Sequence, residues 1–253
     1  MARKIHRYGW TPDIPDQRDF LHAAPPAFQK NLPALADWTA QCPPVYDQGQ
    51  LGSCTANAIA GAIAFDQRKE QAATFMPSRL FIYYNERVIE GTTDSESGAQ
   101  IRDGIKTVAA QGACHETLWP YVAGKFAQPP PKDCYGDAQA HKVVLYQRVA
   151  QTLGAMRGCL ASGYPFVFGF TVYESFESDG TTATGIVPMP QSDESVIGGH
   201  AVMAVGYDDH GAQFIVRNSW GADWGLKGYC RMPYAYLTQA GLATDFWTIR
   251  TVV

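Results

Sequence analysis

The spacing of hydrophobic residues changes about halfway along the chain. In the first half, apolar residues between positions 54 and about 69 recur at the spacing of one helical face, which predicts a helix. The face consists of Ala56, Ile59, Ala60, Ile63 and Ala64. Ser53 stands where an N-cap residue is expected. The stretches SRLFIYYNERVIEG and GAQIRDGIKTVAAQG predict two more helices, and Gly112 is expected to close the second.

In the second half, short runs rich in β-branched and aromatic residues predict strands. They are HKVVLYQRV, YPFVFGFTV, HAVMAVGY, QFIVRNSW and GYCRMP, with one predicted helix, QTLGAMRGCLASG, between them. The turn-rich stretch FAQPPPKDCYGDAQ separates the two halves. The pattern therefore predicts an α+β fold with a mainly helical lobe, 32–137, and a mainly β lobe, 138–253.

Residues 1–31 differ from both lobes. They are polar and rich in proline and aspartate, and AAPPAF at 23–28 predicts an extended segment. We therefore treat 1–31 as an N-terminal extension.

Composition and charge exclude several classes of protein. The chain has 253 residues, 46% of them hydrophobic and 17% charged, which indicates an ordered globular protein. A net charge of −4 gives no basic footprint for nucleic acid, and no apolar stretch has the roughly 20 residues that span a bilayer. The basic N-terminus is not followed by an apolar core, so we expect no secretory signal, and a location in the cytoplasm or export by another route.

Cys54 lies directly before the predicted helix, where the helix dipole and free N–H groups favour a thiolate. The alternative is a buried, inert thiol. A nucleophilic thiol needs a base and a group that orients the base. The predicted hairpin GGHAVMAVGYDDHGAQFIVRNSWG supplies both: its turn lies at 208–211, and the midpoint of His200 and Asn218 is (200 + 218)/2 = 209. Positions equidistant from a turn face each other, so we expect the Asn218 amide beside the His200 imidazole, within one residue of register.

Two other groups bear on this chemistry. Gln48 precedes Cys54 by a short Gly-rich loop, and with the Cys54 backbone N–H it would form a two-donor oxyanion hole. Cys114 and His115 are a rival pair, but adjacent residues on an extended chain point to opposite sides. None of the six cysteines forms a C-x-x-C pair, so we expect no zinc ribbon or finger.

Three blocks, DQGQLGSCTANA, GGHAVMAVGYDD and FIVRNSWGADWGLKGYCRM, resemble the signature blocks of papain-like cysteine peptidases and occur in the same order. The resemblance covers about 32–253. It implies a two-lobe papain-like fold, with a helical lobe, an antiparallel β-barrel-like lobe and the active site in the cleft between them. The roles that it implies are Gln48 as oxyanion donor, Cys54 as nucleophile, His200 as acid and base, Asn218 as orienter, and Trp220 and Trp224 as an aromatic shield.

The resemblance also implies a substrate cleft of small, uncharged residues, which favours an apolar substrate side chain. The positions that match it, with Trp220, are Gly98, Ala99, Ile101, Gly169, Gly198 and Ala201. Three residues depart from the family pattern. Leu51 replaces a cysteine that usually forms a disulfide, Thr55 replaces an aromatic residue, and Gly199 replaces a polar one.

The resemblance implies a cysteine peptidase that hydrolyses peptide bonds through a thioacyl intermediate, without metal or organic cofactor. Its partners would be peptide or protein substrates, with no nucleic acid and no membrane, and we expect a monomer. The alternatives are an acyltransferase or transamidase with the same triad, and a catalytically silent binding protein. The N-terminal extension is shorter than the family's helical propeptide. It is expected to restrain activity at the cleft, as in a zymogen, or only to stabilise the lobe around which it wraps.

Overall fold

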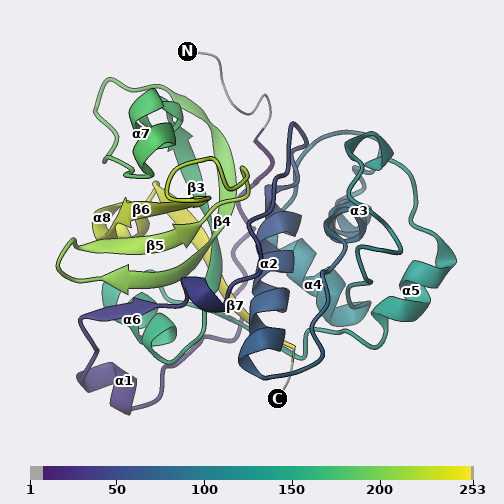
Figure 1. Cartoon of the computed structure of the whole chain (residues 1–253), viewed down its shortest axis with the longest axis horizontal. Coiled ribbons are helices and arrows are strands. Elements are labelled where there is room, and N and C mark those ends of the chain that lie inside the picture. Colours follow the sequence, from purple (N-terminus) through teal and green to yellow (C-terminus); the bar gives the residue numbers. More distant parts are fainter. Residues whose placement is uncertain (1–7, 252–253) are drawn as a thin grey trace.

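The computed structural model describes residues 8–251. Four helices gather on one side of the molecule and an antiparallel sheet with smaller helices on the other, as Figure 1 shows. The four are α2 (Cys54–Lys69), α3 (Arg79–Glu90), α4 (Ile101–Ala110) and α5 (Lys132–Ala138). The first three confirm the predicted helices. The fourth lies in the stretch that we predicted to be a connector, so that prediction was wrong there.

Helix α2 stands between the two halves (Figure 1) and is buried along residues 54–67. Its alanines and Gly61 allow close approach on all sides, and the Gly61 Cα faces the Arg217 and Met203 side chains. Ser53 occupies the N-cap position, but its side chain does not cap the helix. The Ser53 hydroxyl instead lies 2.5 Å from the Tyr121 hydroxyl, so its predicted capping role was wrong.

The sheet runs in the order β2-β7-β3-β4-β5-β6, and β1 pairs with β4 outside this path. Its strands are β1 (Leu35–Asp37), β2 (Leu145–Arg148), β3 (Phe166–Tyr173), β4 (Val196–Asp208), β5 (Gln213–Arg217), β6 (Tyr229–Pro233) and β7 (Ala243–Arg250). Every pair is antiparallel. Within residues 8–251 the sheet ends at β2 and β6, so it is open and not the expected barrel.

Five of the strands confirm the predicted runs, and β1 and β7 were missed. Strand β1 is only three residues long, and it joins the sheet from within the half predicted to be helical. The predicted helix of the second half is α6 (Leu153–Ala161), and the short helices α7 (Asp179–Thr184) and α8 (Tyr234–Thr238) were not predicted. Helix α1 (Ala27–Lys30) begins inside the segment predicted to be extended.

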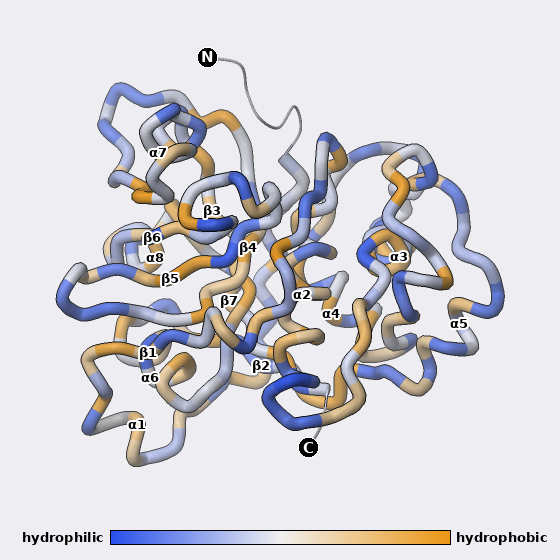
Figure 2. Tube along the Cα trace, viewed as in Figure 1, coloured by the Kyte–Doolittle hydropathy of each residue, from blue (hydrophilic) through white to orange (hydrophobic). Residues whose placement is uncertain are grey.

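Two hydrophobic clusters cover the two faces of the sheet. One is built on α2, α3 and α4 and includes Ile59, Phe81 and Trp247; the other includes Phe168, Phe214 and Trp224 on the opposite face. Figure 2 shows hydrophilic residues concentrated in the outer loops and turns. Among residues 8–251, no helix has both the length and the apolar character needed to cross a bilayer.

Residues 8–22, here called the N-terminal strap, run in extended form between the two halves (Figure 1). The strap pairs with both. Trp10 forms a parallel bridge with Ala99 just before α4, and Leu21 forms one with Arg148 of β2. The part of the N-terminal extension before Tyr8 lies outside the described residues.

Candidate active site

Cys54 is the first residue of α2 and is completely buried. Backbone N–H groups at a helix start have no partner within the helix, so this is an electropositive place for a thiol. The backbone N–H groups of Ala201 and Gly9 act on the thiol in the direction that lowers its pKa. Ala201 directly follows His200 on β4, and β4 packs against α2, so the strand that carries the imidazole lies against the helix that begins with Cys54.

His200 is oriented by Asn218. Its Nε2 lies 2.8 Å from Oδ1 of Asn218, so the amide oxygen accepts a hydrogen bond from the ring. Within the described residues, the buried Nδ1 of His200 has no hydrogen-bond partner. The ring is therefore held in the orientation and tautomer that leave a second nitrogen free for proton transfer.

The contact between the two side chains was predicted correctly, but the register was not. Met203 pairs with Arg217 beyond a bulge between Ala204 and Gly206, so a continued ladder would place Asn218 opposite Val202, two residues from His200. Asn218 leaves the ladder after Arg217, and its N–H bonds to the Gly228 carbonyl at 2.9 Å. It reaches His200 diagonally from the end of β5.

Aromatic rings enclose this pair. The Trp220 ring lies 5.0 Å from the His200 ring, and Trp224 lies 5.4 Å from Trp220. Phe176, which the sequence analysis missed, contacts all three rings. Trp220 and Trp224 are both buried, as a shield of the hydrogen bond from water requires.

Gln48 lies in the loop before Cys54, with its amide held at both ends. Nε2 donates to the Leu51 carbonyl at 3.0 Å, and Oε1 accepts from the Ser219 hydroxyl at 2.6 Å. A primary amide nitrogen carries two hydrogens, so one remains for another acceptor. Ser219, next to Asn218, was missed by the sequence analysis because this contact joins two distant loops.

Burial makes the neutral forms of Cys54 and His200 more stable. Desolvation raises the pKa of Cys54 to about 12, with the backbone N–H groups of Ala201 and Gly9 acting against this shift. Desolvation also lowers the pKa of His200 to about 4, and the hydrogen bond to Asn218 opposes this shift. With the strap in place the site therefore holds a thiol and a neutral imidazole.

The strap lies directly on the predicted substrate residues. The Ala99 N–H donates to the Gly9 carbonyl at 2.8 Å, and the Thr11 N–H donates to the Ala99 carbonyl at 3.1 Å. On the other side, the Trp10 N–H donates to the Gly199 carbonyl at 3.1 Å. The strap backbone thus pairs with Ala99 of the helical half and with Gly199 of the β half.

Several predicted substrate positions are glycines that the strap covers. A Cβ at Gly169 would lie 1.9 Å from the Trp10 ring, one at Gly198 would lie 2.3 Å from the Tyr8 ring, and one at Gly98 would lie 2.3 Å from the Gly9 carbonyl oxygen. Gly98 also needs glycine for its φ of +72°. Of the other predicted positions, Ile101 begins α4 and is buried, and the Ala201 N–H acts on the thiol as described above.

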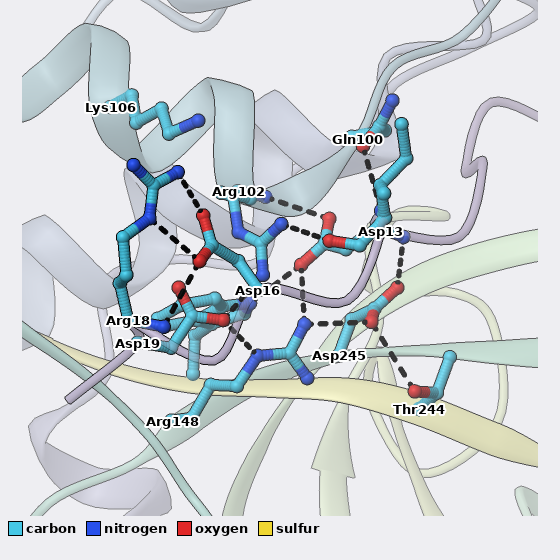
Figure 3. A network of polar contacts seen from close by, with 12 residues as sticks. Asp13, Asp16, Arg18, Asp19, Gln100, Arg102, Lys106, Arg148, Thr244 and Asp245 are labelled. Atoms are coloured by element: carbon cyan, nitrogen blue, oxygen red, sulfur yellow. Dashed lines mark hydrogen bonds and ion pairs between the residues drawn. The ribbon is translucent and has the colours of Figure 1, made fainter. Parts of the chain in front are cut away.

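Further along, the strap is held by an ion-pair network (Figure 3). Arg148 of β2 lies between three carboxylates, 3.2 Å from Asp13, 2.8 Å from Asp19 and 3.4 Å from Asp245. Arg102 of α4 forms a second ion pair with Asp19. The strap is therefore tied to both halves of the molecule.

Asp13 is the most buried member of the network, with its side chain inaccessible to solvent. It accepts a hydrogen bond from the Trp247 indole at 2.8 Å, and its backbone N–H donates to Asp245 at 2.8 Å. Burial and the neighbouring Asp245 carboxylate together raise the pKa of Asp13 to about 6.

Two of the family departures have structural consequences. Leu51 is buried, and all six cysteines, each in the described part of the chain, are free thiols. Thr55 donates a hydrogen bond of 2.6 Å to the completely buried Glu86, whose pKa is raised well above its usual value by desolvation.

His115 is paired with Asp137 at 2.8 Å, which is consistent with discounting it as the partner of Cys114.

A model of the papain family cysteine proteases matches residues 32–248. The chain is 53% identical over 215 residues to an uncharacterised peptidase C1-like protein of Acanthamoeba polyphaga mimivirus, covering 81% of this chain and 69% of that protein. It is 29% identical to the thiol protease aleurain of Arabidopsis thaliana, covering 84% of this chain but only 59% of aleurain. The crystal structure of xylellain, a cysteine protease from Xylella fastidiosa, superimposes with a TM-score of 0.93 at 45% identity, over 100% of this chain and 99% of that one.

Proposed function

Because this chain belongs to the papain family of cysteine proteases, we propose that it cleaves peptide bonds with Cys54 as nucleophile, His200 as acid and base, and Asn218 as orienter. The observation that carries the assignment is the 2.8 Å contact between His200 Nε2 and Asn218 Oδ1, with Nδ1 unpartnered among residues 8–251. It leaves one ring nitrogen free to exchange a proton with the neighbouring thiol.

Acylation begins with proton transfer from the Cys54 thiol to Nδ1 of His200. The thiolate attacks the carbonyl carbon of the substrate, and the C=O electron pair moves onto the oxygen. When the tetrahedral intermediate collapses, the C–N bond breaks and the His200 imidazolium protonates the leaving amine. In deacylation His200 takes a proton from water, the hydroxide attacks the thioester, and the proton returns to the sulfur as the C–S bond breaks.

The developing oxyanion would be bound by Gln48 and the backbone N–H of Cys54. The Ser219 hydroxyl on Oε1 and the Leu51 carbonyl on Nε2 hold the Gln48 amide in one orientation. Donors that are already oriented need no reorganisation when the charge forms, and one such donor is worth about 2.7–4 kcal/mol.

The N-terminal strap is proposed to restrain this activity. Gly9 and Trp10 occupy the hydrogen-bonding positions of Ala99 and Gly199, so a substrate backbone cannot pair there at the same time. The strap also packs against His200, since the Tyr8 ring lies 6.1 Å from the His200 ring. Release of the strap would admit both substrate and water, and water favours the charged thiolate.

The substrate pocket is proposed to accept a large apolar side chain. In the strapped state, Gly169 and Gly199 face the Trp10 ring, and Gly198 faces the Tyr8 ring. Surfaces that accommodate these aromatic rings have the shape and polarity for a bulky apolar residue. A panel of peptide substrates varied at this position would contradict the proposal if a charged residue were preferred.

Active-site titration with an epoxide inactivator of thiol peptidases, followed by mass mapping, tests the triad. We expect one label per chain, on Cys54, with labelling and peptide hydrolysis abolished in Cys54→Ala. Cys42→Ala is the matched control, because Cys42 is also a buried thiol but contacts Trp38. Labelling that persists in Cys54→Ala would overturn the assignment. A product that forms only with an added amine would indicate a transamidase.

A further inference from the structure

A cluster of three side chains in the helical half is not used by the proteolytic site. His115 follows the loop after α4, Asp137 lies in the last turn of α5, and His141 comes just after that helix. One ligand atom from each residue can be chosen so that all three lie within 4.8 Å of one another. Two imidazoles and a carboxylate are typical ligands of a divalent transition metal such as Zn²⁺.

The backbone holds the three residues in place. His115 is bridged to Pro77, and the Asp137 carboxylate accepts from the His115 backbone N–H at 2.9 Å. The Ala113 N–H donates to the His141 carbonyl at 3.2 Å, which ties the two segments together beside the cluster. A site with anchored ligands loses less conformational entropy when an ion binds.

The His115 ring already contacts Asp137, whereas the ring nitrogens of His141 are available to a ligand. The His115 ring lies 2.8 Å from Asp137 through Nδ1, while no ring nitrogen of His141 has a hydrogen-bond partner in the part of the chain that the structure describes. Phe75 lies 4.3 Å from the ring of His115 and 4.3 Å from that of His141. Phe75 thereby restricts both rings.

The cluster is also accessible. His115 and Phe75 line an open hollow of about 530 Å³, and the side chains of His115 and Asp137 are 38% and 27% exposed. An ion can therefore enter, and water can complete a tetrahedral shell around three protein ligands.

We propose that His115, Asp137 and His141 form a Zn²⁺ site that clips the end of α5 to the loop after α4. When the ion binds between His115 and Asp137, a neutral His115 ring moves its proton from Nδ1 to Nε2, and the Nδ1 lone pair binds the metal. No net proton release from that ring is required. The catalytic reaction does not involve this ion, so the inference is independent of the proposed function.

The test uses a Cys54→Ala background, because a thiol beside an imidazole can itself bind Zn²⁺. Co²⁺ absorption in the visible region and calorimetry with Zn²⁺ should both show one ion per chain, and Zn²⁺ should raise the melting temperature by a few degrees. His141→Ala should weaken binding by at least about 100-fold, because even the outer-shell partners of metal ligands are worth about 10–100-fold. It should also abolish the thermal shift.

His210→Ala is the matched control, since His210 is an exposed histidine in the β4–β5 turn. It should bind Zn²⁺ like the parent. His141→Gln provides a second loss variant if His141→Ala does not fold. Absence of binding at millimolar Zn²⁺ would overturn the proposal. A Zn²⁺ affinity of the folded His141 variants that lies within about twofold of the parent's affinity would also overturn it.

Discussion

Replacing Trp10 by alanine should release the N-terminal strap from the catalytic cleft. The Trp10 side chain is almost buried, at 9% exposure, against Gly169 and Gly199. A buried tryptophan removes about 150–250 Å² from water, which at about 25 cal/mol per Å² is worth roughly 4–6 kcal/mol. Alanine keeps part of this contact, and the released strap still buries some surface. We therefore expect docking to weaken by about 3–4 kcal/mol.

This change corresponds to an increase of about 10²–10³-fold in the ratio of released to docked strap, because 1.4 kcal/mol is a factor of ten. The rate at which an epoxide inactivator labels Cys54 should rise in proportion, until the released form predominates. Labelling at inactivator concentrations below saturation measures this rate directly. Peptide hydrolysis should increase by a similar factor.

Trp38→Ala is the control for a general loss of stability. Trp38 is half-buried, and its indole donates to the Leu160 carbonyl at 2.8 Å, away from the strap. It should lower the melting temperature with little effect on the labelling rate. If Trp10→Ala is folded and is labelled no faster than the parent, the strap does not limit access and serves only to stabilise the fold.

Three other substitutions test the site and its supports. Asn218→Ala removes the hydrogen bond to His200, worth about 1–3 kcal/mol, so kcat/KM should fall about 5–150-fold; an unchanged value would exclude Asn218 as orienter. Docking raises the pKa of Asp13 from 3.8 to about 6, so the contribution of Asp13 to docking is largest below pH 4 and falls by up to about 3 kcal/mol as the pH rises to above 6. The ratio of labelling rates, Asp13→Asn over parent, should therefore fall across this range, and a flat ratio would refute the argument. Desolvation raises the pKa of Glu86 beside Thr55, which favours the neutral acid. Glu86→Gln should therefore cost less than about 1 kcal/mol in thermal denaturation at pH 7, whereas a loss above about 3 kcal/mol would indicate an ionised carboxylate.

The sequence by itself determined the elements that local patterns encode. The apolar face from Ala56 to Ala64 predicted α2, and five aromatic or β-branched runs predicted five of the seven strands. It also indicated that His200 and Asn218 meet, because a hairpin turn brings its flanking residues together whatever the rest of the fold does. The error in register arose because the turn lies at 209–212 and not at 208–211, and because a bulge between Ala204 and Gly206 shifts the ladder.

Only the tertiary structure decided which residues the strap and the loop that carries Gln48 contact around the site. The contacts of Trp10 with Gly169, of Asp13 with Asp245 and of Gln48 with Ser219 each join residues more than 150 positions apart. Such contacts depend on the packing of the two halves around α2, and periodicity or turn chemistry carries no information about them. The shifted pKa values of Cys54 and His200 also come from the tertiary structure. A helix start favours a thiolate at Cys54, but burial, which is a property of the whole fold, raises the pKa of this thiol to about 12.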